Sequence, residues 1–175
     1  MIKKTVFSFV FLVLTTTTTI AQNAVKEYKA GHVFYVSLPE YMTKTVELNS
    51  AAILQYKSQV KDVYGFIIED NKEELALAEF NYTSINEFYE DFIKDFVVDQ
   101  DKRKVSSPLS TKKGTINFIE SDVTYFDKEA GMDIYYLVGI VETKDAYYKI
   151  LSWSAEKNKE QFKADFQKII YSLRD

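Results

Sequence analysis

The stretch IYYLVGIV at residues 134–141 is apolar at nearly every position, and it decides the fold. In a β-strand, successive side chains point to opposite faces, so this stretch would present apolar side chains on both. One face would carry Ile134, Tyr136, Val138 and Ile140, and the other Tyr135, Leu137 and Val141. A strand that is apolar on both faces is covered on both, so the sequence predicts a sheet with one layer above it and one below it.

Two similar segments flank this stretch, at residues 115–126 and 146–153, and both are rich in aromatic and β-branched residues. Such residues favour strands. Residues 127–131 can turn the chain between the first two segments, and Lys144-Asp145 can form a tight hairpin before the third. The sequence therefore predicts an antiparallel meander of three long strands.

Further strands are predicted nearer the N-terminus. Residues 33–38, VFYVSL, read as a strand that Pro39 ends, because proline cannot donate to a sheet ladder. Residues 52–56 and 63–69 have the composition of a strand pair, with a polar connection between them. Together with the meander they give an antiparallel sheet of about six strands.

Two amphipathic helices are predicted. Ser84 and Glu87 have the spacing of a capping box, and apolar residues then recur at helical intervals over residues 85–97. The second helix would be capped by Asn158 or Ser154. Its apolar positions are Phe162, Phe166, Ile169, Ile170 and Leu173.

These elements define an α+β fold, an α/β/α sandwich in which helices flank both faces of an antiparallel sheet. The length and the low glycine and proline content predict a single domain over residues 32–175. The sequence leaves open which helix covers which face. It also leaves open whether residues 73–80 form a helix or a strand, since that run is short.

The N-terminus has the layout of a secretory signal peptide at residues 1–21. The apolar run at residues 6–14 follows two lysines and is about half as long as a membrane-spanning helix. Cleavage is predicted between Ala21 and Gln22, and the alternative is an uncleaved N-terminal anchor. Residues 22–31 are polar and are predicted to be a flexible lead-in.

Composition narrows the possible destination and partners. The chain has no cysteine, so it cannot carry a lipid on cysteine or form disulfides. Loss of the two leader lysines changes the formal charge from −4 to about −6, which disfavours a nucleic-acid partner. The run Lys102-Arg103-Lys104 is predicted to be a solvated turn. We expect a protein exported to the periplasm or secreted, without a stable membrane anchor after cleavage.

Few residue patterns point to catalysis. His32 is the single histidine, and the chain has neither a cysteine nor a G-x-S-x-G motif, so a nucleophilic triad is not expected. Asp99 and Asp101 lack the remaining ligands of a calcium loop. The sequence predicts no catalytic residues, no cofactor and no metal ligands, and hence no enzyme. A pair of convergent carboxylates stays possible, because composition cannot exclude it.

The aromatic content is the remaining functional signal, since Tyr and Phe number 13 each. Many of these residues fall on the predicted meander. The simpler interpretation is core and cross-strand packing. The alternative is that Tyr125, Tyr135 and Tyr147 contribute to a partner surface or line a shallow groove, because aromatic residues are enriched at the centres of interfaces.

The order of elements resembles the PsbP-like fold family, which includes PsbP, Mog and envelope proteins of the DcrB type. The resemblance covers roughly residues 32–174. It rests on VFYVSLP at 33–39, VYGFII at 63–68, TSINEF at 83–88 and YYKILSW at 147–153, followed by the apolar positions of the last helix. It implies an antiparallel sheet between helices and no catalytic set.

From these observations we expect an exported, non-enzymatic PsbP-like domain that binds a protein or serves as an assembly or accessory factor of the cell envelope. Its partner would be an envelope protein that the sequence does not name. The domain would be a monomer or a weak dimer. One alternative is a small-ligand carrier with an aromatic-lined pocket between a helix and the sheet, and a less favoured one is a carboxylate-based hydrolase.

Overall fold

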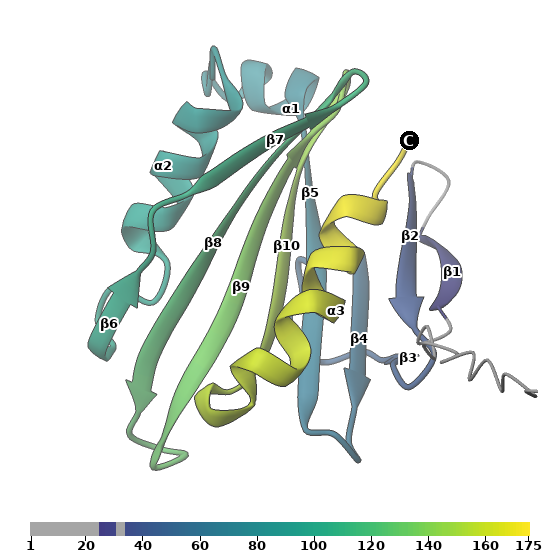
Figure 1. The fold of residues 1–175 in the computed structure, drawn as a ribbon. Helices are drawn as coiled ribbons and strands as arrows, with labels where there is room; N and C mark the ends of the chain where they lie inside the picture. Colours follow the sequence, from purple (N-terminus) through teal and green to yellow (C-terminus); the bar gives the residue numbers. More distant parts are fainter. Residues whose placement is uncertain (1–24, 31–33) are drawn as a thin grey trace, which may run out of the picture.

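A long antiparallel sheet separates two layers in the computed structural model, which describes residues 25–30 and 34–175 (Figure 1). The predicted signal peptide at residues 1–21, its cleavage site between Ala21 and Gln22, and His32 lie outside the described residues.

Over residues 34–175, eight strands form one antiparallel sheet. From one edge to the other the order is β3 (Thr43–Lys44), β4 (Leu54–Ser58), β5 (Val63–Asn71), β10 (Ala146–Ala155), β9 (Met132–Glu142), β8 (Ile116–Asp127) and β6 (Asp101–Val105), while β7 (Leu109–Lys113) also pairs with β8. The predicted meander is confirmed as β8, β9 and β10. The predicted α+β class and antiparallel sheet are confirmed as well.

The sheet has eight strands and not the expected six. The strand predicted at residues 33–38 lies outside this sheet, as β2, while β3, β6 and β7, which are short and mostly polar, were not predicted. The prediction of a solvated turn at Lys102-Arg103-Lys104 was wrong, since these residues form most of β6. These residues form a strand because their backbone pairs with β8. Such pairing does not depend on the local composition, so the sequence of residues 101–105 does not reveal it.

A separate two-stranded ribbon is formed by β1 (Val25–Ala30) and β2 (Phe34–Pro39). The prediction of a flexible lead-in at residues 22–31 therefore does not hold over 25–30. The alternating side chains of β2 are buried, which fixes its backbone and offers β1 an ordered edge for pairing. Strand β2 also pairs with Arg174, which follows α3. The Tyr35 amide donates to the Arg174 carbonyl at 2.7 Å, and the Arg174 amide donates to the Tyr35 carbonyl at 3.1 Å.

The two faces of the sheet carry different elements (Figure 1). The helix α3 (Lys159–Ser172), preceded by a 3₁₀ turn at Glu156–Asn158, covers one face together with β2. The helix α2 (Ile85–Asp95) covers the other, and the short helix α1 (Lys72–Leu77) precedes it. The two-sided covering predicted for residues 134–141 is thereby confirmed.

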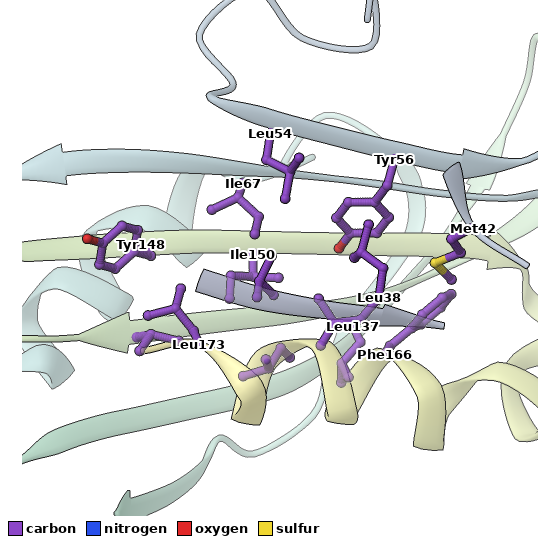
Figure 2. Packing of buried hydrophobic residues seen from close by; sticks show 14 of the residues in the cluster. Leu38, Met42, Leu54, Tyr56, Ile67, Leu137, Tyr148, Ile150, Phe166 and Leu173 are labelled. Atoms are coloured by element: carbon purple, nitrogen blue, oxygen red, sulfur yellow. The ribbon is translucent and has the colours of Figure 1, made fainter. Parts of the chain in front are cut away.

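The core under α3 draws side chains from β2, β4, β5, β9 and β10 toward the helix. Figure 2 shows Leu38, Tyr56, Ile67, Leu137 and Phe166 converging in this layer. The five apolar positions predicted for the last helix are all buried. Asn158 is the N-cap residue of α3, although its side chain makes no capping hydrogen bond.

The core under α2 is smaller and positions the candidate site. Val138 and Ile140 of the central strand β9 pack there with residues of β8 and β10. From the helix side, the buried residues are Ile85, Phe88, Tyr89 and Ile93. Within the described ranges, no helix is both long enough and apolar enough to cross a membrane.

Candidate binding groove

An open hollow lies between α1, its connection to α2, α2 itself and the sheet, near the end of β5 and the start of β10. It has a volume of about 460 Å³, and it adjoins a second hollow of about 200 Å³. We call the two together the α1–α2 groove. The larger hollow is lined by Asp70, Leu75, Phe80, Tyr82, Phe88, Asp91, Phe92, Asp95, Phe96 and Lys149. The smaller is lined by Lys72, Leu75, Ala76, Phe80, Asn81, Tyr82, Thr83 and Tyr147.

Two side-chain caps fix the helices that form the groove. The Asn71 Oδ1 atom accepts hydrogen bonds from the Glu73 and Glu74 amides at 2.8 and 3.3 Å, which starts α1 directly after β5. Ser84 Oγ accepts from the Glu87 amide at 3.3 Å, so the predicted capping of α2 is confirmed. Glu87 accepts in return from the Thr83 amide at 2.7 Å. These caps hold the connection between the helices in a fixed path.

Aromatic rings form the wall between the groove and the sheet. The Phe88 ring stacks on Tyr147, with centroids 4.4 Å apart and an interplanar angle of 9°. Tyr82 meets Phe88 edge-on at 5.1 Å, and Phe80 stacks beside Tyr82 at 6.4 Å. Phe80 keeps 55% of its surface exposed. The wall is thus anchored in the core at one end and open to solvent at the other.

An ion pair lies at the base of the larger hollow. Lys149 Nζ is 2.8 Å from Asp70 Oδ2, and both side chains are about four-fifths buried, with exposures of 19% and 22%. The Lys149 ammonium also lies 5.7 Å from the ring centre of Phe88 and 5.8 Å from that of Phe92. The two charges neutralise each other, and the cation rests against aromatic faces.

Two further polar contacts meet at Asp91, at the rim of the larger hollow. The Tyr82 hydroxyl donates to Asp91 Oδ2 at 2.6 Å, and Lys94 Nζ donates to Asp91 Oδ1 at 2.5 Å. These two hydrogen bonds lower the pKa of Asp91, with Lys94 as the larger cause. The bond to Asp91 also raises the pKa of Tyr82 to about 12. At neutral pH the carboxylate is ionised and the phenol is neutral.

Among the residues that the structure describes, the carboxyl groups with clearly displaced pKa values are all displaced downward. Hydrogen bonds from Thr83 lower the pKa of Glu87. In Glu142, burial opposes ionisation, but hydrogen bonds from Lys72 and Asn117 outweigh it. Asp122, also opposed by burial, is held ionised by Lys163, Lys159 and Tyr135. A general acid needs a raised pKa, so these groups are not suited to that role. Because their pKa values are lowered, they stay ionised at neutral pH and can bind positive charge.

The acidic side chains do not cluster as metal ligands in the part of the chain that the structure describes. Within residues 25–30 and 34–175, no group of three or more His, Cys, Asp or Glu side chains could hold a metal ion.

The three tyrosines predicted to form a partner surface are buried and do not come together. Tyr135 is fully buried against α3 and donates to Asp122 at 2.8 Å. Tyr125 and Tyr147 lie on the other side of the sheet, with exposures of 9% and 3%. The partner-surface interpretation does not fit these positions, because a strand apolar on both faces buries its aromatic side chains in two cores. Only Tyr147 contributes to the groove, as part of its inner wall.

Apart from Tyr147, the groove residues were missed by the sequence analysis. Phe80 and Tyr82 lie between two helices. Phe80 is the last residue of the segment 73–80, whose secondary structure the sequence left open, and Tyr82 follows that segment. Asp70 and Lys149 come from strands far apart in the chain that pair in the sheet. The available signal was the pair of aromatic residues just before the Ser84 cap, at a place where a loop would ordinarily be polar.

No family model matches the chain, and no curated protein matches it by sequence. Solved structures do match it. Cyanobacterial PsbP (CyanoP) from Synechocystis sp. PCC 6803 is 10% identical with a TM-score of 0.61, over 92% of this chain and 98% of CyanoP. LpqN, described as involved in cell envelope biogenesis of Mycobacterium tuberculosis, is 9% identical with a TM-score of 0.52, over 86% of this chain and 91% of LpqN.

A third similar structure is PA94 from Pseudomonas aeruginosa, a protein of unknown function. It is 7% identical with a TM-score of 0.50, over 86% of this chain and 96% of PA94. At such low identities the similarity concerns the fold alone. The resemblance seen in the sequence is confirmed at that level, and the chain has the PsbP-like fold.

Proposed function

We propose that this chain is an exported, non-enzymatic accessory domain of the cell envelope, and that it acts by binding a partner protein in the α1–α2 groove. The observation that carries the proposal is the exposed aromatic wall of the groove. Phe80 is 55% exposed. Leu77, which follows the lining residues Leu75 and Ala76 in α1 but does not itself line the groove, is 81% exposed. Partly exposed aromatic residues beside a hollow are typical of the central residues of protein interfaces.

The chemistry of the groove favours binding over catalysis. Its base holds a neutralised ion pair, and Asp91 at its rim has a lowered pKa. A carboxylate-based hydrolase would need one carboxylic acid that stays protonated near neutral pH. The envelope location is supported by the signal-peptide pattern of residues 1–21 and by the fold shared with LpqN.

Photo-cross-linking from a position beside the groove tests the proposal. A photoreactive amino acid placed at Leu77 should capture a discrete protein when the chain is expressed in its own cell envelope. The same group placed at Val60, which is 97% exposed in the turn between β4 and β5, should not capture that protein. Adding Phe80→Ser to the Leu77 probe should lower capture about tenfold or more, since interface aromatics commonly contribute this much.

Folding must be checked in the same variants. Because Phe80 is more than half exposed, Phe80→Ser should change Tm by no more than about 2 °C. Equal capture from Leu77 and Val60, or capture that survives Phe80→Ser in a folded protein, would contradict the proposal.

A small-ligand carrier is the second candidate, and the volume of the larger hollow favours it. About 460 Å³ falls within the range of pockets that hold small molecules. Native mass spectrometry of the protein purified from its own envelope would detect a bound molecule as a discrete added mass. Loss of that mass in Phe80→Ser, with no cross-linked protein from Leu77, would favour the carrier.

A further inference from the structure

The groove consists of two hollows with a common wall. Leu75, Phe80 and Tyr82 line both, so the hollows lie side by side along the connection between α1 and α2. Two neighbouring hollows of about 460 and 200 Å³ can receive two side chains of one extended segment. Recognition of extended peptides commonly uses such successive side-chain pockets.

The two hollows differ in charge. The larger is lined by three carboxylates, Asp70, Asp91 and Asp95, against the single ammonium of Lys149. The smaller has Lys72 as its one charged lining residue, beside apolar and aromatic side chains. Acidic character is therefore concentrated in the larger hollow.

The basic residues of the groove already have partners. Lys149 pairs with Asp70, and Lys72 donates to Glu142 Oε1 at 2.8 Å and to the Thr143 carbonyl at 2.9 Å. Neither ammonium is available to a ligand without breaking a contact inside the protein. An acidic ligand would therefore find no free cation among the lining residues.

Asp95 is the exception among the acids. Within residues 34–175 its exposed carboxylate makes no ion pair and no side-chain hydrogen bond. The pKa of the neighbouring Lys94 is raised mainly by the hydrogen bond of its ammonium to Asp91, and the charge of Asp95 adds a smaller contribution. Asp95 is also the last residue of α2, where the helix dipole disfavours negative charge. Arg103 binds the carbonyls of Ile93 and Phe96 at this helix end, but it makes no ion pair with Asp95. A cation supplied by a ligand would offset the unfavourable negative charge of Asp95 at this end of α2.

Building on the proposed function, we infer that the segment received by the groove belongs to a partner protein and carries a lysine or arginine next to an apolar side chain. The basic side chain enters the larger hollow and reaches Asp95, with its methylene groups against Phe92 and Phe96. The apolar side chain enters the smaller hollow against Ala76 and Tyr147. Complementary charge selects the segment, and apolar burial supplies much of its affinity.

Two synthetic peptides test this inference by NMR titration of the folded domain. Both are capped at the termini and contain leucine and phenylalanine, and they differ only in carrying lysine or glutamate at the polar positions. The lysine peptide should shift backbone amides of residues 72–97 and bind at least about fivefold more tightly than the glutamate peptide. Added salt should reduce that ratio, since the carboxylate is exposed.

Matched variants locate the charge. Asp95→Asn should weaken binding of the lysine peptide about threefold, leave the glutamate peptide unchanged, and keep or slightly raise Tm. Asp99→Asn, which removes an exposed carboxylate of a different hollow, should have no effect. Phe80→Ser should weaken both peptides.

Several results would overturn the inference: equal binding of both peptides, tighter binding of the glutamate peptide, no binding of either, or shifts that are confined to residues away from the lining of the groove. Amide shifts in the groove that grow with protein concentration in the absence of peptide would identify a second copy as the occupant instead. If the inference alone fails, cross-linking from Leu77 still captures a protein and is insensitive to Asp95→Asn. If the proposed function fails, that capture is absent.

Discussion

Residue 65 is a glycine, and because it has no side chain, Tyr56 can extend across the strand that carries it. Gly65 on β5 lies beneath the ring of Tyr56, which extends from β4 and places its hydroxyl oxygen 2.7 Å from Ser152 Oγ on β10. A Cβ atom at residue 65 would overlap that ring. Burial also raises the pKa of Tyr56. One glycine thus allows a polar contact to join three adjacent strands inside the core.

Gly65→Ala is therefore expected to lower the free energy of unfolding by about 2–4 kcal/mol, because the ring must leave its position in the core. Urea unfolding of the folded domain measures this. Tyr56→Phe is the control, since it removes only the hydroxyl and should cost about 1 kcal/mol. A loss in Gly65→Ala no larger than that of Tyr56→Phe would show that the ring does not need the space.

At the scale of elements, the end of α2 depends on a distant strand. The register of β6 shifts between Asp101 and Lys104, a bulge that redirects the side chain of Arg103. Arg103 then donates to the Phe96 carbonyl at 2.9 Å and to the Ile93 carbonyl at 2.5 Å. Val97 follows with a φ of 49°, in a position where helices usually have glycine.

Replacing Arg103 should therefore loosen the last turn of α2. Arg103→Ala is expected to destabilise the domain by about 1.5–3 kcal/mol, and Arg103→Lys should restore little, because a lysine cannot reach two carbonyls with a planar fork. Hydrogen exchange should accelerate at residues 93–97 and stay unchanged in α3. Lys104→Ala, on the same strand, should leave exchange in α2 as it is, and an equal effect of both changes would argue against the cap.

The two ends of α2 show how far local sequence determines an element. The start was predicted, because Ser84 and Glu87 lie within one turn of each other. The end was placed too late, since Phe96 and Val97 continue the apolar period although the helix ends at Asp95. What ends it is Arg103, which reaches the helix through the pairing of β6 with β8. No window of neighbouring residues contains that information.

At the scale of the whole molecule, tyrosines are part of both cores. Burial is the largest cause that raises the pKa of Tyr41, Tyr56, Tyr135, Tyr136, Tyr147 and Tyr148. The core tyrosines of the meander were predictable from strands apolar on both faces, whereas the groove was not. Its walls depend on how residues 72–84 cross the sheet, and that path is set by packing between segments distant in sequence.

Alkaline pH should therefore unfold this domain. Unfolded tyrosines ionise near pH 10, while the folded domain keeps its buried phenols protonated. Their contribution to stability is complete below about pH 10 and is lost as the pH rises above that value. A series of Tm measurements from about pH 8 to about pH 12, read together with tyrosinate absorbance, should show Tm falling from about pH 10 and absorbance rising at unfolding. A Tm that stays constant across that range would contradict the expectation.

The backbone pairing between Tyr35 and Arg174 has a consequence for how the chain folds. The core beneath α3 needs β2 from one end of the folded region and the helix from the other, so it cannot close before residue 173 has been synthesised. Contacts this distant in sequence slow folding. The layer beneath α3 therefore stays open until residue 173 has been made, and a chain that has not finished folding is one that can be threaded across a membrane.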